Sequence, residues 1–317
     1  MELYIAECLQ SVMRQTYDGE MECILVDDCS SDNSIVIAWQ LISDYHGKIE
    51  FHILHHEHNR GLSASRNTGT EFATGEYVFY LDSDDYISDD CLTLLTKPLN
   101  TSNYDMIIGD YVTFGDYLMP SLLFEQKTEI NGTPNIFHEF AHCQLPVTAW
   151  NKLCNLIFLK KNSLDFVEGQ LHEDDLWMYK ICISATKVAI QKHVTYFYRQ
   201  RTNSIVRDSN IKIKQRFDSF FITIDYILNH KGCAKLDDYE NCALTYVNKW
   251  LMYALAGDFD FYKEYQNMRS RFQYYPISAF LHQKETLRSL FRMIHYQLPV
   301  RLGYITLIFR RMISKYK

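Results

Sequence analysis

Strand-like and helix-like segments alternate through the first two hundred residues of this chain. Apolar side chains recur at helical spacing over 3–13, and a continuous apolar run typical of a buried strand follows at 21–27. The alternation continues with expected strands at 49–54, 76–82 and 104–110 and expected helices at 34–45, 61–75 and from 89 onward. This order predicts an α/β domain with a mixed, mainly parallel, Rossmann-like sheet flanked by helices.

The strand-like segments stop near residue 206. Beyond it, 208–230, 237–256 and 258–273 have helical patterns, and 284–317 forms a basic helical tail. We therefore expect two parts, an α/β domain at 1–206 and a helical extension at 207–317.

Composition and charge narrow the classes of function. The net charge of -7 over 317 residues argues against nucleic acid as the main partner. The nine cysteines are an odd number and include no Cys-x-x-Cys pair, which favours free thiols in a reducing compartment over disulfides or a zinc site. No segment reaches the roughly 18 consecutive apolar residues of a membrane span, so we expect the chain in the cytoplasm.

Aspartates directly follow two of the expected strands. Asp27 and Asp28 end the first apolar run, and Asp82 and Asp84 follow the run at 77–81. Because ligands of open α/β sheets bind outside the carboxyl ends of the strands, both pairs are expected at one cleft.

The Asp-x-Asp pair Asp82 and Asp84 has several interpretations. It can be a solvated turn, or a site for Mg²⁺ or Mn²⁺ beside a phosphorylated ligand, where the cation neutralises the clustered acids. A calcium loop of the EF-hand type is excluded, because its fifth position is Tyr86 and its sixth is not glycine. A haloacid-dehalogenase-type phosphatase would need Thr or Val at the position of Tyr86.

Five motifs occur in a fixed order over roughly 1–205. They are ILVDDCSSDNS (24–34), NRGLSASRNTG (59–69), GEYVFYLDSDD (75–85), WNKL (150–153) and HEDDLW (172–177). Together they closely resemble glycosyltransferase family 2, whose members are inverting nucleotide-sugar transferases with the GT-A fold. The segment YFYRQRTNSI (196–205) is similar to the closing segment of members that act in bacterial capsule and lipopolysaccharide synthesis.

The resemblance implies nucleotide contacts at the matching positions. Asp28 would accept a hydrogen bond from the uracil ring, and Asp27 would support its loop. Arg66 would approach the nucleotide, and Gly61 would keep the backbone close to it. Asp82 would lie near the ribose and diphosphate.

The resemblance also implies the reacting groups. Asp84 would be the chief ligand of Mg²⁺ or Mn²⁺, with Asp82 as the second. Asp174 matches the position of the catalytic base, and Glu173 is its neighbour. The segment after the last strand would cover the diphosphate or the acceptor through Arg199, Arg201 and Ser204.

These residue types suit an inverting transfer. Displacement at the anomeric carbon needs a base on the acceptor hydroxyl and charge stabilisation on the departing diphosphate. Together with this chemistry, the resemblance implies a metal-dependent hexosyltransferase (EC 2.4) that uses a UDP-sugar and a surface-polysaccharide or glycolipid acceptor. Two alternatives stay open: Asp174 is a helix-start acid favoured by the helix dipole, and the chain is a non-catalytic remnant that binds a nucleotide or a partner.

The chain departs from the family at its start. Members open with an apolar strand and a Pro-x-Tyr-Asn-like turn before the helix that appears here at 2–17. That strand is central in the sheet, so its absence would leave unpaired backbone on both neighbouring strands. The explanations are a reading frame that extends upstream of Met1, which we favour, or a shortened and inactive protein.

Three smaller features complete the sequence. Four histidines crowd 51–59, where we expect a loop edge in preference to a metal site, and Cys29 stands where the family more often has glycine. The tail at 284–317 carries eight basic residues against Glu285 alone. Its last segment predicts a basic amphipathic helix, which can lie on an anionic membrane surface, here the inner face of the plasma membrane. The alternative is that its apolar side packs on the catalytic domain.

Overall fold

The computed structural model describes residues 1–115, 127–201, 211–256, 261–271 and 298–314. The chain forms two compact units, one of Met1–Asp208 with Gly232–Ala234 and one of Ser209–Lys231 with Lys235–Lys317. The boundary predicted near 206 and the predicted site residue Ser204 both fall in 202–210, outside the described residues.

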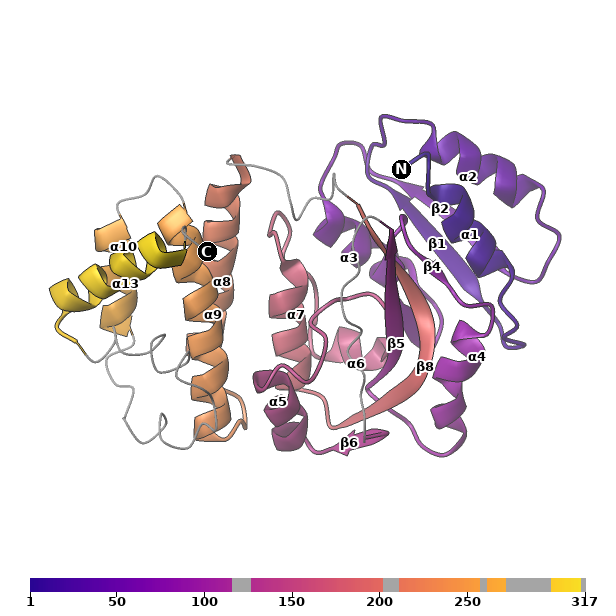
Figure 1. The fold of residues 1–317 in the computed structure, drawn as a ribbon. Helices are drawn as coiled ribbons and strands as arrows, with labels where there is room; N and C mark the ends of the chain where they lie inside the picture. The colour runs from indigo at the N-terminus through magenta and orange to yellow at the C-terminus, as the bar shows by residue number, and fades with distance from the viewer. Residues whose placement is uncertain (116–126, 202–210, 257–260, 272–297, 315–317) are drawn as a thin grey trace. The chain divides into compact units, whose positions relative to one another are not determined.

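Two β-sheets form the centre of the first unit (Figure 1). In the smaller sheet, β1 (Glu22–Asp27) pairs in parallel with β2 (Glu50–His55), which sets Asp27 opposite His55. The larger sheet has the order β3-β7-β5-β8-β4, with β6 paired to β8. Its strands are β3 (Tyr77–Phe79), β4 (Tyr86–Ile87), β5 (Met106–Gly115), β6 (Glu129–Asn131), β7 (Lys152–Asn155) and β8 (Lys187–Gln200).

The strands at 21–27, 49–54, 76–82 and 104–110 all form where the sequence predicts them, and the mixed α/β architecture is confirmed. The larger sheet is less parallel than expected, because β5 and β8 are parallel whereas β4, β6 and β7 each pair antiparallel. These antiparallel strands have two to four residues. Segments that short have no residue periodicity to reveal them.

The two sheets share a core without a hydrogen-bonded junction among the described strands. There β1 pairs with β2 alone and β3 pairs with β7 alone. Cys23 and Phe51 of the smaller sheet nevertheless pack against the same buried cluster as Tyr77 and Phe79 of the larger one. Among the described strands, side-chain packing therefore joins the two sheets where backbone hydrogen bonds do not.

Helices cover both faces of β1. On one face, α1 (Ile5–Met13) and α2 (Ser34–Ser43) join Ile5, Leu9 and Ala38 into a buried cluster that contacts Leu25. On the other face lies α3 (Leu62–Phe72), whose Gly69 approaches Val26. The N–H groups of Arg60 and Gly61 donate to Asp28, which places the start of α3 beside the carboxyl end of β1.

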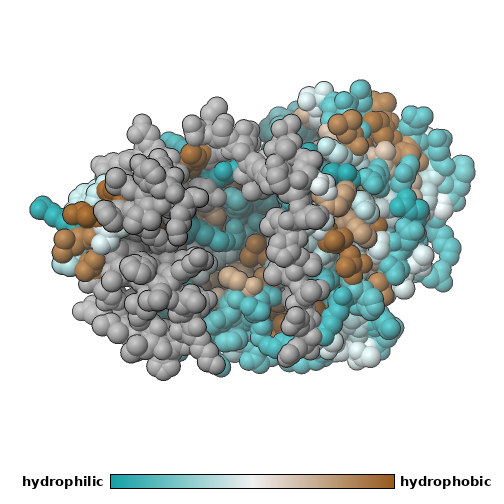
Figure 2. All heavy atoms as spheres, in the orientation of Figure 1, coloured by the Kyte–Doolittle hydropathy of each residue, from teal (hydrophilic) through white to brown (hydrophobic). Residues whose placement is uncertain are grey.

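Further helices complete the first unit. They are α4 (Cys91–Thr96), η1 (Lys97–Asn100), α5 (Thr133–Ala141), α6 (Leu156–Lys161) and α7 (Glu173–Cys182). The outer side of the α1–α2 region remains apolar, since Leu3, Val36 and Trp39 are exposed. Figure 2 shows this hydrophobic surface where α2 and the N-terminal turn reach the outside.

The second unit consists of helices in its described part. They are α8 (Ile211–Asn229), α9 (Leu236–Ala256), α10 (Phe261–Arg271) and α13 (Val300–Ser314), close to the predicted segments. Phe217 and Trp250 pack their rings 4.7 Å apart between α8 and α9. Among the described helices, none is long and apolar enough to cross a membrane. The part of the basic tail at 284–297 lies outside the described residues.

Candidate active site

The loop after β3 carries three aspartates with different surroundings. Asp85 is buried: its Oδ2 accepts from the Tyr196 hydroxyl at 2.6 Å, and its Oδ1 accepts from the Arg199 backbone N–H at 2.7 Å. The Asp82 N–H also donates to the Tyr196 hydroxyl, at 3.2 Å. Burial, followed by the charges of Asp84 and Asp82, raises the pKa of Asp85 to about 8. Asp85 therefore anchors the loop to β8, a role that the sequence did not indicate.

Asp84 faces the end of β8. Its carboxylate forms an ion pair with Arg201, and its backbone carbonyl accepts from Arg199 Nε at 2.9 Å. Burial raises the pKa of Asp84, while Arg201 acts in the opposite direction. The structure thus brings the predicted ligand Asp84 together with both predicted arginines. Carboxylate oxygens are the donors that Mg²⁺ and Mn²⁺ prefer, so Asp84 and Asp82 fit such an ion chemically.

Arg199 and Arg201 are held by aromatic rings as well as by acids. The Arg199 guanidinium lies 4.5 Å from the Phe114 ring centroid and 4.9 Å from that of Tyr4, and it also pairs with Glu7. Arg201 lies 5.2 Å from the Tyr4 ring centroid. Stacking on aromatic faces fixes the guanidinium planes, so the start of α1 and the end of β8 form one cationic edge beside Asp84.

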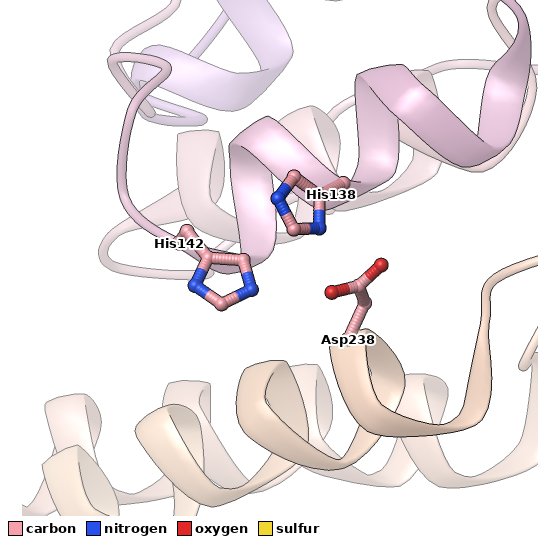
Figure 3. Close-up of side chains that lie close together, drawn as sticks. All are labelled: His138, His142 and Asp238. Carbon is pink, nitrogen blue, oxygen red and sulfur yellow. The ribbon is translucent and has the colours of Figure 1, made fainter. Parts of the chain in front are cut away.

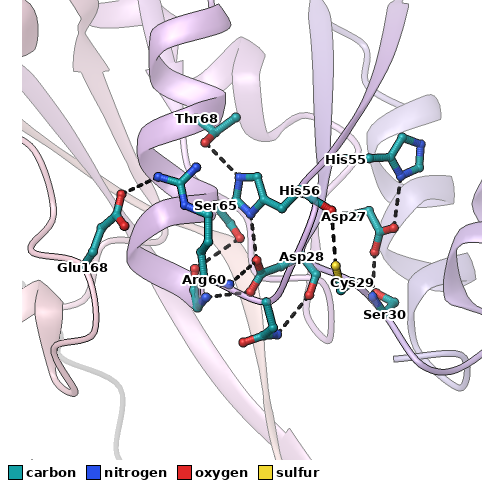
Figure 4. Close-up of polar contacts among 12 residues, drawn as sticks. Asp27, Asp28, Cys29, Ser30, His55, His56, Arg60, Ser65, Thr68 and Glu168 are labelled. Atoms are coloured by element: carbon teal, nitrogen blue, oxygen red, sulfur yellow. Dashed lines mark hydrogen bonds and ion pairs between the residues drawn. The ribbon is translucent and has the colours of Figure 1, made fainter.

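Asp28 accepts three hydrogen bonds from the residues around it (Figure 4). Its Oδ1 accepts from the Arg60 N–H and from His56 Nδ1, both at 2.7 Å, and its Oδ2 accepts from the Gly61 N–H at 2.7 Å. Although desolvation raises the pKa of Asp28, these donors outweigh it and hold the pKa below its ordinary value. Asp28 is therefore an ionised acceptor at the carboxyl end of β1.

Two residues beside Asp28 have left-handed backbone. Gly61 has φ 87° at the start of α3, a conformation that glycine adopts at little cost. Cys29 has φ 58°, a left-handed conformation that costs on the order of 1 kcal/mol in a non-glycine residue. Asp27 supports this turn, because its Oδ1 accepts from the Ser30 N–H at 2.9 Å.

Arg66 connects the loop after β3 to helix α7, which carries the predicted base Asp174. From the middle of α3 its Nη2 donates to Asp82 Oδ1 at 2.8 Å, and its Nη1 donates to Glu173 Oε1 at 2.7 Å. The guanidinium lies 5.2 Å from the ring centroid of Phe166, and 7% of the side chain is exposed. One cation therefore holds two carboxylates that are about ninety residues apart in the chain.

Asp174 lies in the first turn of α7 next to this contact and is half-buried. Burial, followed by the charges of Glu173 and Asp175, raises the pKa of Asp174, and Arg66 and Lys152 oppose that shift. Lys152, in the WNKL motif, is fully buried, and burial lowers its pKa to about 8. Its Nζ donates to the Thr148 carbonyl. An acid and a lysine with pKa values shifted in opposite directions are typical of a functional site, and no role was predicted for Lys152 from its motif.

The predicted site residues form two groups: Asp27, Asp28 and Gly61 at the carboxyl end of β1, and the residues around the loop after β3. Asp82, Asp84, Arg199 and Arg201 meet at the loop after β3, and Arg66 links that loop to Glu173.

A pair of side chains that could bind a metal ion occurs away from the site. His138 and His142 lie one turn apart at the end of α5, with ring centroids 4.4 Å apart (Figure 3). Two histidines do not complete a metal site, and the third labelled side chain, Asp238, belongs to the other unit.

The part of the chain that contains these motifs is also similar to known proteins. Residues 2–143 match the sequence model described as Glycosyl transferase family 2. The chain is 26% identical to Glycosyltransferase GlyG of Streptococcus pneumoniae serotype 4 over 211 residues, which are 64% of this chain and 69% of GlyG.

Solved structures share the fold. The crystal structure of S. aureus TarS 1–349 with UDP matches with a TM-score of 0.67 and 20% identity, over 95% of this chain and 84% of that one. The mannosyltransferase PcManGT from Pyrobaculum calidifontis, in complex with GDP-Man and Mn²⁺, matches with a TM-score of 0.55 and 16% identity, over 88% and 79% of the two chains. These likenesses confirm the expected GT-A fold.

Proposed function

We propose that the chain, whose residues 2–143 match glycosyltransferase family 2, acts as a member of that family and transfers a sugar from a UDP-sugar, with inversion, to a hydroxyl of a surface-polysaccharide or glycolipid acceptor. The observation that carries the proposal is the double contact of Arg66. It sets the loop with Asp82 against the first turn of α7. A donor held by the loop would therefore present its anomeric carbon near Asp174.

Asp28 would recognise the uracil base. It is ionised and lies at the carboxyl end of β1, beside the close backbone approach at Gly61. An anionic acceptor pairs with the N3–H of uracil, whereas cytosine offers only an acceptor there. This difference supports UDP as the donor nucleotide.

Asp84 and Asp82 would hold Mg²⁺ or Mn²⁺, which when bound supplies positive charge to the departing diphosphate. Arg201 already places a cation at Asp84 in this structure, and Arg199 lies beside it. These arginines would add to the stabilisation of the leaving group at the same edge of the sheet.

Asp174 would accept the proton of the acceptor hydroxyl. Its raised pKa makes its ionised form a stronger base than an exposed aspartate. Glu173 is held by Arg66 and is therefore not free to serve as the base in the same geometry. One base suffices, because inversion proceeds by a single displacement without a covalent glycosyl-enzyme.

The proposal places the enzyme in the cytoplasm, at the inner face of the membrane that carries the acceptor. The described helix α13 carries Arg301, Arg310 and Arg311, together with apolar residues such as Leu302 and Ile305, which are both exposed. A helix of this composition can lie among lipid headgroups.

Calorimetry and turnover together test the proposal. UDP should bind more tightly with Mn²⁺ than without it, and Asp84→Ala should remove that difference. Asp174→Asn should keep UDP binding within about threefold while UDP release from a UDP-sugar falls about 10²–10⁴-fold, the usual effect of losing a general base. Asp89→Ala is a matched control, because Asp89 pairs with Arg14 on the exposed surface.

Two results would overturn the proposal. Normal turnover of Asp174→Asn would remove the base assignment. UDP binding without sugar transfer to water or to any glycolipid offered would support the non-catalytic alternative.

A further inference from the structure

His56 occupies a buried position between the two elements that form the uracil side of the site. It follows the last residue of β2, and its backbone N–H donates to the Asp27 carbonyl at 3.0 Å, which continues the ladder with β1. Successive strand residues point to opposite sides. His55 therefore has 51% of its side chain exposed, whereas His56 has 5% exposed.

Both ring nitrogens of His56 have partners in the site. Nδ1 lies 2.7 Å from Asp28 Oδ1, and Nε2 lies 2.9 Å from the Thr68 hydroxyl on α3. Since an ionised carboxylate only accepts, Nδ1 carries the hydrogen and donates to Asp28. The other ring nitrogen, Nε2, shares a hydrogen bond with the Thr68 hydroxyl. Figure 4 shows this chain of contacts from Asp28 through the imidazole to α3.

The contact with His56 determines which lone pairs of the Asp28 carboxylate remain available to a ligand. Oδ1 accepts from His56 and the Arg60 N–H, whereas Oδ2 accepts only from the Gly61 N–H among the described residues (Figure 4). Without His56, Asp28 would keep the Arg60 and Gly61 N–H donors but lose its bond to an imidazole that Thr68 holds in the body of α3. The carboxylate would then be held from the side of the loop alone, with more freedom to tilt.

We propose that His56 is a positioning residue for nucleotide selection: by bridging Asp28 to Thr68, it orients Asp28 Oδ2 toward the N3–H of a uracil base. The inference rests on the proposed function, since it assumes that Asp28 meets the base. His56 itself does not contact the nucleotide. Its effect is on the choice between uracil and cytosine.

The test is the ratio of the dissociation constants for CDP and UDP, measured by calorimetry with Mn²⁺. His56→Ala should weaken UDP binding about tenfold or more, the effect of losing a hydrogen bond to a charged group. CDP binding, which gains nothing from an oriented acceptor, should change little, so the ratio should fall about tenfold. His55→Ala is the matched control, because His55 also bonds an aspartate, Asp27, from an exposed position.

Conservative variants separate orientation from folding. His56→Asn keeps an amide donor near the position of Nδ1 and should retain most of the ratio. His56→Gln places its amide nearer Thr68 and should lose it. Thr68→Val, which removes the hydroxyl at equal volume, should lower the ratio by a smaller factor than His56→Ala.

Each outcome has one meaning. An unchanged ratio in His56→Ala, with wild-type protein that prefers UDP, overturns the inference and leaves the proposed function standing. An equal loss of UDP and CDP binding also overturns it, because that pattern indicates general loosening of the loop. Wild-type protein that binds neither nucleotide refutes the proposed function first.

Discussion

Replacing Arg66 by methionine should destabilise the first unit far more than the same replacement of Arg60. Both arginines pair with a glutamate from another part of the chain at a similar distance, 2.7 Å for Arg66 with Glu173 and 2.6 Å for Arg60 with Glu168. They differ in burial. The Arg66 side chain is 7% exposed and Glu173 12%, whereas Arg60 and Glu168 are 37% and 48% exposed.

The magnitudes follow from that difference. Removing one partner of a buried ion pair costs about 3–5 kcal/mol, because the remaining charge is left without compensation. Here Asp82 and Glu173 would both lose their cation, beside a third acid at Asp174. An exposed pair contributes about 0–1 kcal/mol. Methionine fills most of the space of the arginine stem, so packing loss adds little in either variant.

Urea unfolding measures both effects. Trp177 is buried in the first unit and reports its unfolding, and the signal of Trp250 from the second unit is removed by working in a Trp250→Phe background. With a slope of about 2 kcal/mol per M urea, Arg66→Met should lower the midpoint by roughly 1.5–2.5 M. Arg60→Met should lower it by less than about 0.5 M.

Arg66→Lys refines the comparison. Lysine keeps the charge but lacks the fork that reaches two carboxylates at once, so its midpoint should fall between the wild type and Arg66→Met. Equal urea midpoints for Arg66→Met and Arg60→Met would refute the reasoning, since burial would then have no effect on how much an ion pair contributes to the free energy of unfolding.

Three more predictions concern other parts of the chain. Burial raises the pKa of Asp174, so the fraction of ionised base grows as the pH rises through that raised pKa. Turnover should therefore increase with pH well above the ordinary aspartate pKa of about 4. A turnover profile that is already flat above pH 5 would contradict this. All nine cysteines are free, and a thiol reagent should modify the exposed Cys29, Cys143 and Cys233 quickly in the native protein and the others after unfolding; nine equal rates would contradict the burial. The full chain should sediment with anionic vesicles at low salt and be released at high salt, whereas a chain that ends at 283 should stay in the supernatant; equal behaviour of the two would place the tail against protein instead of lipid.

Much of the fold could be predicted from local pattern. A continuous apolar run located β1, and the order of strand-like and helix-like segments after it located β2 and α3. The three short antiparallel strands were not predictable in this way, since they form by pairing with distant segments. Residues 86 and 87 are strand β4 only because β8, over a hundred residues later, pairs with them.

The candidate site likewise has features that the sequence predicts and features that only the tertiary structure determines. Sequence alone determined that acids follow β1 and β3, that an arginine stands in α3, and that HEDDLW begins a helix, because motif order and strand ends are local properties. Which acid does what was decided by tertiary contacts. Asp85 turns inward because Tyr196 and the Arg199 N–H meet it, while Asp84 faces Arg201.

The same holds for the groups that no motif singled out. His56 was one of four crowded histidines in the sequence, and its role follows from the alternation of side chains at the end of β2 together with the approach of α3. Arg66 contacts Glu173 across 107 positions of chain. A sequence pattern fixes the type and local placement of a side chain, but its partner depends on which distant segment packs against it, because hydrogen bonds and ion pairs form between atoms that only the folded chain brings within about 3 Å.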